Sequence, residues 1–391
     1  MFFLTPKYLK QGRLYVKAAE KKLAYHRDVW TPEICSTMAG LIASLKQALK
    51  EKSRERVAES EKAIEGFCAI HCPMGPNAWI SENVEVVLVA IIVALGIRTF
   101  VVQPFTIPTS SMSPTLKGIT GMRTTEPPPN IAKQALDFAL YGRSWHNVVA
   151  LADERVISVA SEVRGGLRRI FEYTKITTDQ QNIYWVNAAQ QPLEDSQFGG
   201  RGGWHGMMFK KGEPIVRGYT DTGDHVFVNK FIYHFRKPTR GEVIVFLTQN
   251  IEGLGNSGPP PRDPSQFYIK RLAGGPGDTL SIASPQLFVN GELGQEPGFR
   301  RVMEGTQNAP VNGGYRGYSP GPRESQPYNM SGPAIKFTVP AKTYFPMGDN
   351  SYSSKDGRYF GPVPQDNMCG SGFLVYWPFL RDGGTHLGLI R

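Results

Sequence analysis

Three short stretches, far apart in the chain, carry residue types that could do chemistry. The first, QPFTIPTSSMSPTLKG from Gln103, is rich in hydroxyl side chains. The second, FYIKRLAGGPGDTL from Phe267, places Lys270 and Arg271 inside an otherwise apolar strand pattern. The third, MGDNSYSSKDGRYFGPVP from Met347, is dense in turn-forming and charged residues. Each stretch alone has a plain explanation, because Ser/Thr-rich and Gly-Asp-Asn segments are commonly loops and a strand lysine usually reaches solvent.

Taken together, the three stretches indicate a hydrolase with a serine nucleophile and a lysine base. None of the seven histidines lies near a recognisable nucleophile motif, and the chain has neither a G-x-S-x-G elbow nor an H-E-x-x-H sequence. A lysine accepts a proton from serine only when it is neutral, and burial lowers a lysine's pKa because it disfavours the charged form. Tyr268, Ile269 and Leu272 could supply apolar surroundings for Lys270.

Composition excludes several classes of protein. With 391 residues, 40% of them hydrophobic and 20% charged, the chain has ordinary globular usage, which argues against wholesale disorder and against a protein with many membrane spans. The net charge of +10 is shared evenly between residues 1–78 and the rest of the chain. Since no zinc-finger spacing, RNP pattern or basic zipper accompanies this charge, we predict no nucleic-acid partner.

The four cysteines are too few for a disulfide framework, so we interpret them as free thiols. Cys68, His71 and Cys72 lie close together in the sequence, yet no second Cys/His pair follows at zinc spacing and no C-x-x-C-H haem motif is present. The sequence therefore predicts no metal site.

The first part of the chain has a helical pattern from Tyr8 to Phe67, broken at Thr31-Pro32. Thr31 suits the N-cap of a new helix and Pro32 its first position. Apolar residues then recur near a 3.6-residue period between charged ones. We expect a helical hairpin, either packed on itself or offering a surface to a partner or a membrane.

A strongly apolar segment follows from Trp79, with twelve apolar residues and no charge from Val86 to Ile97. Such a segment spans a bilayer only if Glu85 and Arg98 lie near the interfaces, since about 20 residues are needed. The alternative is a buried helix of a soluble protein. We predict one transmembrane helix, and the basic region before it favours a cytoplasmic N-terminus.

After the apolar segment the character changes to short β-branched and aromatic runs between Gly/Pro-rich turns, which predicts a mainly β domain. Asn290-Gly291 is a hairpin signal. The predicted strands are HVFVNKFIYHF from His225, EVIVFLT from Glu242, QFYIKRLA from Gln266, TLSIA from Thr279, QLFVNGEL from Gln286, IKFTV from Ile335 and GFLVYWPF from Gly372.

The motifs PTSSMSPTL, YIKRLAGGPGD and MGDNSYSSKDGRYFG resemble, in order and spacing, three boxes of the bacterial type I signal peptidases, which are Ser/Lys serine peptidases. RGEVIVF from Arg240 and GDHVFVNKF from Gly223 are similar to two further boxes of that family. The resemblance extends from the apolar segment to Pro364. It implies a mainly β catalytic domain of the fold shared by signal peptidases and repressor autoproteases.

The resemblance also implies roles for individual residues. Ser111 matches the nucleophile and Lys270 the general base. Thr109 stands where the family has a serine whose hydroxyl completes the oxyanion hole beside the N–H of Ser111. Ser354 matches a serine that orients the lysine.

Two further groups of residues follow from the resemblance. Asp356 and Arg358 match an ion pair that braces the third motif, and Gly348 and Asp349 match the start of that motif. The alternative is that Asp356 and Arg358 form an exposed ion pair that contributes little to stability. The residues implied to line the substrate pockets, each with plain core as its alternative role, are Phe105, Ile107, Pro108, Leu116, Tyr268 and Ile269.

These roles imply a membrane-bound serine endopeptidase that removes signal peptides from exported preproteins after A-x-A-like sites, with no metal or cofactor. We expect a cytoplasmic helical hairpin region at 1–78, a transmembrane helix at 79–102 and an extracytoplasmic catalytic domain at 103–391, on a bacterial plasma membrane. Preproteins and the lipid bilayer are the implied partners, with the translocation machinery as a further candidate. Two alternatives stay open: a Ser/Lys autoprotease of the repressor type, and a binding or scaffold module for export with the same fold but poor catalysis.

One long segment departs from the family pattern. Residues 118–222 stand where the family has a short connection, and they suffice for a mixed α/β subdomain. We predict a helix near 131–140, strands near 155–163, 169–173 and 182–187, and a Gly-rich loop at GGRGGWHG. An inert excursion, a lid and a docking surface are equally compatible with this insertion.

Overall fold

The computed structural model describes most of the chain, in two compact units, 1–93 and 94–391, which we treat separately. The described residues are 6–72, 78–163, 172–188, 193, 198, 204–251, 253–254, 266–304, 317–320, 328, 330 and 335–390.

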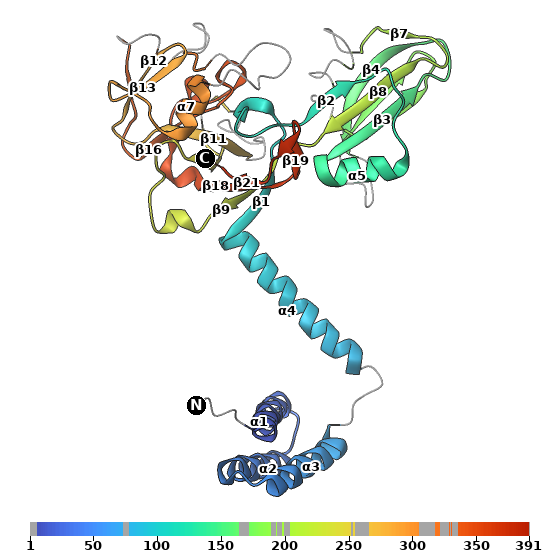
Figure 1. The fold of residues 1–391 in the computed structure, drawn as a ribbon, viewed down its shortest axis with the longest axis vertical. Helices are drawn as coiled ribbons and strands as arrows, with labels where there is room; N and C mark the ends of the chain where they lie inside the picture. The colour runs from blue at the N-terminus through green and yellow to red at the C-terminus, as the bar shows by residue number, and fades with distance from the viewer. Residues whose placement is uncertain are drawn as a thin grey trace. The chain divides into compact units, whose positions relative to one another are not determined.

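Residues 6–72 of the first unit form three helices, α1 (Lys7–His26), α2 (Pro32–Glu51) and α3 (Arg54–His71) (Figure 1). The predicted two-helix hairpin is therefore wrong, although its break at Thr31-Pro32 is confirmed. The second break arises because Lys52 adopts a left-handed conformation and the hydroxyl of Ser53 caps α3 by accepting a hydrogen bond from the N–H of Arg56. The predicted apolar stripe forms the core, in which Met38, Leu45, Val57 and Ile64 are buried.

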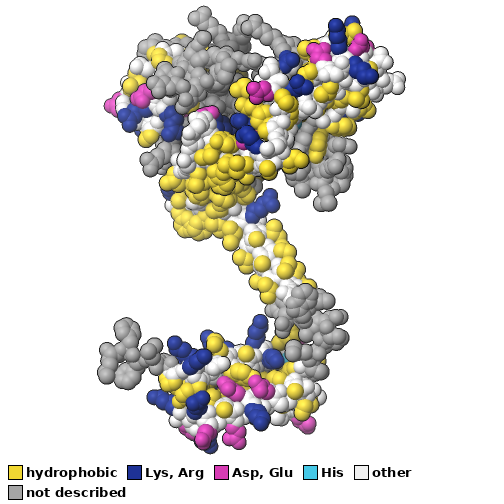
Figure 2. Space-filling model, turned by 45° about the vertical axis from the view of Figure 1, so that its right-hand side comes forward, with side chains coloured by type: hydrophobic (Ala, Val, Ile, Leu, Met, Phe, Trp, Pro, Cys, Tyr) yellow, Lys and Arg dark blue, Asp and Glu magenta, His cyan; other side chains and the backbone are white. Residues whose placement is uncertain are grey.

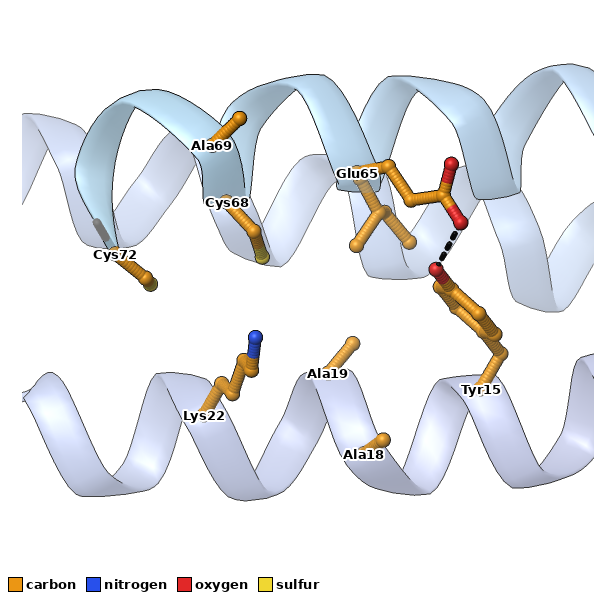
Figure 3. A pocket seen from close by; sticks show the side chains of 9 residues that line it. Tyr15, Ala18, Ala19, Lys22, Glu65, Cys68, Ala69 and Cys72 are labelled. Carbon is orange, nitrogen blue, oxygen red and sulfur yellow. Dashed lines mark hydrogen bonds between the residues drawn. The ribbon is translucent and has the colours of Figure 1, made fainter. Parts of the chain in front are cut away.

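A pocket of about 450 Å³ lies between α1 and α3 (Figure 3). The Tyr15 hydroxyl donates a hydrogen bond of 2.6 Å to Glu65, and burial together with this carboxylate raises the pKa of Tyr15 to about 12. The sulfurs of Cys68 and Cys72 line the pocket as free thiols. Cys35 and Cys369 are also free, which confirms the prediction.

Helix α4 (Ala78–Phe100) coincides with the predicted apolar segment. The large aliphatic side chains from Val86 to Ile97 are exposed all around the helix, as Figure 2 shows for one face. Within the described residues, however, no helix is both long and apolar enough to cross a membrane. The helix is thus where we predicted it, whereas the membrane span is not confirmed.

The second unit is built on an antiparallel sheet with strand order β1-β9-β18-β10-β11-β16-β17, and β21 pairs with β18. The side chains of β10 point alternately to the two faces of the sheet, as in any strand. Val243 and Val245 enter one hydrophobic core, and Ile244 and Phe246 enter another. The bounds are β1 (Val102–Thr106), β9 (His225–Asn229), β10 (Val243–Leu247), β11 (Phe267–Gly274), β16 (Thr343–Met347), β17 (Val363–Pro364), β18 (Met368–Trp377) and β21 (Gly388–Leu389).

A smaller sheet, β14-β13-β12-β15, packs its own core with helix α7 (Pro297–Glu304). Its strands are β12 (Thr279–Ala283), β13 (Gln286–Val289), β14 (Glu292–Leu293) and β15 (Phe337–Thr338). Asn290 and Gly291 form the predicted hairpin turn, both with positive φ, as this tight turn requires. The prediction of a mainly β domain is confirmed.

The insertion carries two sheets, β2-β8-β3 and β6-β5-β4-β7, with helix α5 (Ile131–Tyr141). The predicted helix and two of the predicted strands are present, while 169–171 of the third lie outside the described residues. Trp204, in the predicted Gly-rich loop, is fully buried in the insertion's own core. The strands are β2 (Thr120–Arg123), β3 (Arg143–Val149), β4 (Glu154–Val163), β5 (Glu172–Thr178), β6 (Ile183–Val186), β7 (Met208–Phe209) and β8 (Pro214–Asp221).

Candidate active site

Ser111 and Lys270, 159 positions apart in the sequence, are brought into direct contact. Ser111 lies on the short 3-10 helix η1 (Ser110–Met112), which the fully buried side chain of Met112 anchors in the core. Lys270 extends from β11, and its Nζ lies 2.7 Å from Oγ of Ser111. Both side chains are at least nine-tenths buried. A nucleophile and a base at hydrogen-bond distance are the minimum requirement for a Ser/Lys dyad.

The surroundings of Lys270 favour its neutral form. Burial lowers the pKa of Lys270 from 10.5 to about 8. The carboxylates of Asp356 and Asp349 act in the opposite direction and raise it, while Arg358 lowers it further. Because burial outweighs the two carboxylates, an appreciable fraction of this amine can act as a base near neutral pH.

Thr109 lies directly before η1 and is exposed. Its hydroxyl is 3.4 Å from Oγ of Ser111, so a hydroxyl donor does stand beside the nucleophile, as the sequence predicts. Its part in an oxyanion hole stays a prediction.

The third motif folds against the turn that carries the nucleophile. The N–H of Asn350 donates to the carbonyl oxygen of Ser111 at 3.0 Å, and its side-chain amide donates to the carbonyl oxygen of Ser110 at 3.2 Å. Sequence reasoning missed Asn350. Its position directly after Asp349 in the MGDNSY motif is the signal that could have identified it.

Gly348 allows the close approach of these segments. A Cβ atom at this position would lie 2.1 Å from Oγ of Ser354 and 2.6 Å from the carbonyl oxygen of Ser111, so only glycine fits. Ser354 and the carbonyl oxygen of Ser111 therefore both lie close to Gly348. However, the buried Oγ of Ser354 makes no hydrogen bond in this structure. The bond to Lys270 is not formed, and the orienting role of Ser354 stays a prediction.

Two ion pairs brace the site. Asp356 and Arg358 are 0% and 1% exposed, so the alternative of an exposed pair is wrong. Arg358 donates two hydrogen bonds to Asp356, and the other oxygen contacts of this carboxylate include the N–H of Gly348 at 2.7 Å. Burial alone would raise the pKa of Asp356, but Arg358 and these hydrogen bonds outweigh it and lower the pKa. The pair thus ties the loop to the turn at Gly348.

The second ion pair joins Asp349 to Arg271. Two donor nitrogens of Arg271 lie 2.8 and 2.7 Å from the carboxylate of Asp349, and both side chains are fully buried. Arg271 also donates to the hydroxyl of Thr115 at 3.0 Å, on the segment that carries Ser111. Arg271 is not among the predicted site residues. It follows Lys270 directly on a strand and therefore faces the opposite side, and this position is the signal that could have identified it.

The predicted pocket residues do not all lie at a surface. Ile107 and Leu116 are 2% and 0% exposed and belong to the core, so their assignment to a pocket is wrong in this structure. Pro108 is exposed, and the half-buried members are Phe105, Tyr268 and Ile269. Strand and turn residues of this apolar kind fit either role, and only the packing decides.

An open sheet edge leads to Lys270. Strand β11 pairs with β10 along Phe267–Arg271, whereas its pairing with β16 begins only at Arg271. Among the described residues, no strand covers the second edge of Phe267–Lys270. The ring of Phe105 on β1 packs edge-on against Phe267 at the start of β11, with centroids 5.1 Å apart.

Comparison with known proteins shows the family of the chain. A family model described as signal peptidase, peptidase S26, matches residues 80–124 and 219–377, just over half of the chain and including both members of the dyad. The chain belongs to this family. The match leaves out 125–218, most of the segment that we predicted to be an insertion.

Individual relatives are named signal peptidase I. A signal peptidase I of Pseudomonas fluorescens is 34% identical over 191 residues, which cover 40% of this chain and 61% of the relative. A signal peptidase I of Leptolyngbya laminosa is 29% identical over 163 residues, 42% of this chain and 64% of the relative. The chain thus spans less than two thirds of either relative's length. A solved signal peptidase I from Enterococcus faecalis is 26% identical and covers 35% of this chain and 97% of its own, with a TM-score of 0.22.

Proposed function

We propose that this protein is a serine endopeptidase that removes signal peptides from exported preproteins, with Ser111 as nucleophile and Lys270 as general base. The observation that carries the proposal is the buried contact of 2.7 Å between Nζ of Lys270 and Oγ of Ser111. Burial that lowers the pKa of this lysine to about 8 supplies the base that serine needs.

The proposed reaction uses the same lysine twice. Neutral Lys270 takes the proton from Ser111 as Oγ attacks the carbonyl carbon of the scissile bond. The N–H of Ser111 and the hydroxyl of Thr109 stabilise the oxyanion. Protonated Lys270 then gives its proton to the leaving amine, and the acyl-enzyme is hydrolysed by a water that Lys270 activates in turn.

We further propose that the preprotein binds as an added β-strand along the open edge of β11. Main-chain hydrogen bonds to Phe267–Ile269 would lead the scissile bond to Ser111. In an added strand, alternate side chains face the protein, which agrees with a preference for small residues at the first and third positions before the cut. Phe105 and Tyr268, both half-buried, are the proposed contacts of these side chains.

Attachment to a membrane is part of the proposal. Helix α4 exposes apolar side chains on all sides, and within the described residues no protein core covers them. A helix of this kind is stable in lipid rather than in water. We propose that α4 lies in the bilayer of a bacterial plasma membrane, with residues 1–78 cytoplasmic and residues 103–391 outside. Tethering enzyme and precursor to one surface raises their effective concentration.

Cleavage of a preprotein with an A-x-A site by the detergent-solubilised full chain tests the proposal. We expect wild type to cut after the A-x-A sequence, and Ser111→Ala and Lys270→Ala to be inactive. Ser110→Ala and Lys336→Met are matched controls, since Ser110 is on the same turn and Lys336 is exposed; both should keep wild-type activity.

Two outcomes would overturn the proposal. Cleavage by Ser111→Ala at the wild-type rate would rule out the dyad. An inactive wild type, under conditions in which a control signal peptidase cuts the same precursor, would favour the scaffold function instead.

A further inference from the structure

One buried residue outside the dyad, Asp224, holds both ends of the segment that carries the nucleophile. At the start of this segment, the N–H of Ile107 donates to the carbonyl oxygen of Asp224 at 2.9 Å. At its end, the N–H of Asp224 donates to the carbonyl oxygen of Lys117 at 2.9 Å, and the N–H of Lys117 donates to Oδ2 of Asp224 at 2.8 Å. Residues 107–117 are thus closed into a loop on a single residue, with Ser111 inside it.

The other carboxylate oxygen of Asp224 binds the C-terminal part of the chain. Arg381, on the short strand β19 (Leu380–Arg381), donates from Nη1 to Oδ1 at 2.7 Å. Nε2 of His386 lies 2.8 Å from the same oxygen. Arg381 also donates to the carbonyl oxygen of Thr222, two residues before Asp224 in the chain. Asp224 is 0% and the Arg381 side chain 6% exposed, so this is a buried charge pair.

The backbone segments around Asp224 are in close contact. A Cβ atom at Gly223 would lie 1.7 Å from the carbonyl oxygen of Ile107, and one at Gly118 would lie 2.3 Å from the carbonyl carbon of Thr109. Both glycines are needed because two backbone segments touch there. A displacement of Asp224 must therefore move Ile107 and Thr109, and with them the turn that carries Ser111.

We propose that Asp224, held by Arg381 and His386, is a positioning residue that keeps Oγ of Ser111 within reach of Nζ of Lys270. We call these three residues the clamp. The inference rests on the proposed peptidase function, and none of the three residues touches the dyad in this structure. The insertion leaves the catalytic fold at 118 and returns at 222, so both of its ends join the fold at the clamp.

The expected effect is on kcat rather than KM. The proposed substrate edge, Phe267–Ile269, makes no contact with the clamp, so precursor binding should persist. Misplacing a nucleophile by about 1 Å costs up to roughly 100-fold in rate. For Asp224→Asn, which keeps the shape of the side chain but leaves Arg381 without its counter-charge, we expect kcat to fall about 10- to 100-fold with KM within about twofold of wild type.

A double-mutant cycle tests whether the two charged residues act together. Asp224→Asn and Arg381→Met should each lower kcat, and the double variant should be little worse than either alone, since the pair acts as one unit. Arg381→Lys, which keeps the charge, should restore part of the loss. The matched control is Glu154→Gln. Glu154 is equally buried but binds its hydrogen-bond donors in the insertion's own sheet, so its kcat should equal that of wild type.

Hydrogen exchange of the full chain, followed by mass spectrometry, gives a readout that does not need activity. In Asp224→Asn, peptides covering 107–117 should exchange faster, while peptides from the smaller sheet around β12 and β13 should not change. Wild-type kcat in Asp224→Asn with unchanged exchange over 107–117 would overturn the clamp. If wild type fails to cleave precursor but the exchange difference is present, the peptidase proposal fails and the clamp stands. Should Asp224→Asn not fold, Arg381→Lys provides the same measurements.

Discussion

The pH dependence of cleavage tests the assignment of Lys270 most directly. With a pKa of about 8 in the folded protein, Lys270 is neutral in ~9% of molecules at pH 7, whereas an ordinary lysine with a pKa of 10.5 would be neutral in ~0.03%. Burial therefore raises the population of the active base roughly 300-fold. Since the neutral form is the base, activity must rise with pH.

The expected profile follows from this single titration. Below pH 8, kcat/KM should increase about tenfold per pH unit, so that it rises roughly 50-fold from pH 6 to pH 8. From pH 8 to pH 10 the gain should be only about twofold, because most of the lysine is already neutral. The assay is cleavage of a fixed preprotein at substrate concentrations well below KM, with the fold followed by circular dichroism across the same range.

A second variant tests the cause of the shift as well as its size. Asp356 raises the pKa of Lys270, and its partner Arg358 lowers it. Asp356→Asn removes the first effect and leaves the second, so the midpoint of the profile should move to lower pH. A profile that is flat between pH 6 and pH 8, or one whose midpoint lies near 10, would refute a buried lysine as the base. A shift to higher pH in Asp356→Asn would refute the electrostatic account.

Three further predictions concern single side chains. Thr109→Ser should keep activity, whereas Thr109→Val should lower kcat about 100- to 1000-fold, the usual effect of one lost oxyanion donor; steady-state kinetics on the same precursor measures both. Lys270→Met should be inactive yet more stable than wild type at pH 7, by about 2 kcal/mol after the lost hydrogen bond is counted, because the fold holds a lysine whose pKa lies below the unfolded value of 10.5. That difference should shrink as pH rises through the window from 8 to 10.5, which thermal unfolding at pH 7 and pH 10 would reveal. Arg358→Met leaves the buried carboxylate of Asp356 without its paired arginine side chain and should cost about 3 to 5 kcal/mol in urea unfolding, while Arg240→Met, at a partly exposed pair, should cost under about 1 kcal/mol.

Much of the dyad could be predicted because its chemistry depends on few residue types. The residue types predicted a Ser/Lys hydrolase, and the family resemblance then implied Ser111 and Lys270, which the structure places in contact. The β-branched and aromatic run EVIVFLT likewise predicted a strand, which the structure has as β10. Both predictions rest on motifs of a few consecutive residues, which can be identified in the sequence without knowledge of the fold.

What the sequence did not reveal depends on packing between distant segments. Ile107 and Leu116 are apolar residues beside the nucleophile, and nothing in their spacing distinguishes a pocket wall from the core in which they lie. Helix α2 ends because Lys52 adopts a left-handed conformation. Lysine is not a residue type that favours this conformation, so the sequence does not predict it. The contact between Asp224 and Arg381 joins positions 157 apart, with no motif at the second position.

The buried charges around Lys270 are arranged so that they do not undo its function. The loop that shapes the site needs the carboxylates of Asp349 and Asp356 to hold backbone and guanidinium groups in place. Left unpaired, two carboxylates near Lys270 would stabilise its protonated form and keep the base inactive at neutral pH. Each is instead paired with a buried arginine, Arg271 or Arg358. Arg358 lowers the pKa of Lys270 and so opposes Asp356, and burial outweighs what remains of the two carboxylates' effect. In the proposed mechanism the pair of Asp356 and Arg358 therefore has two effects, because the arginine that braces the loop also opposes the charge that would hold Lys270 protonated.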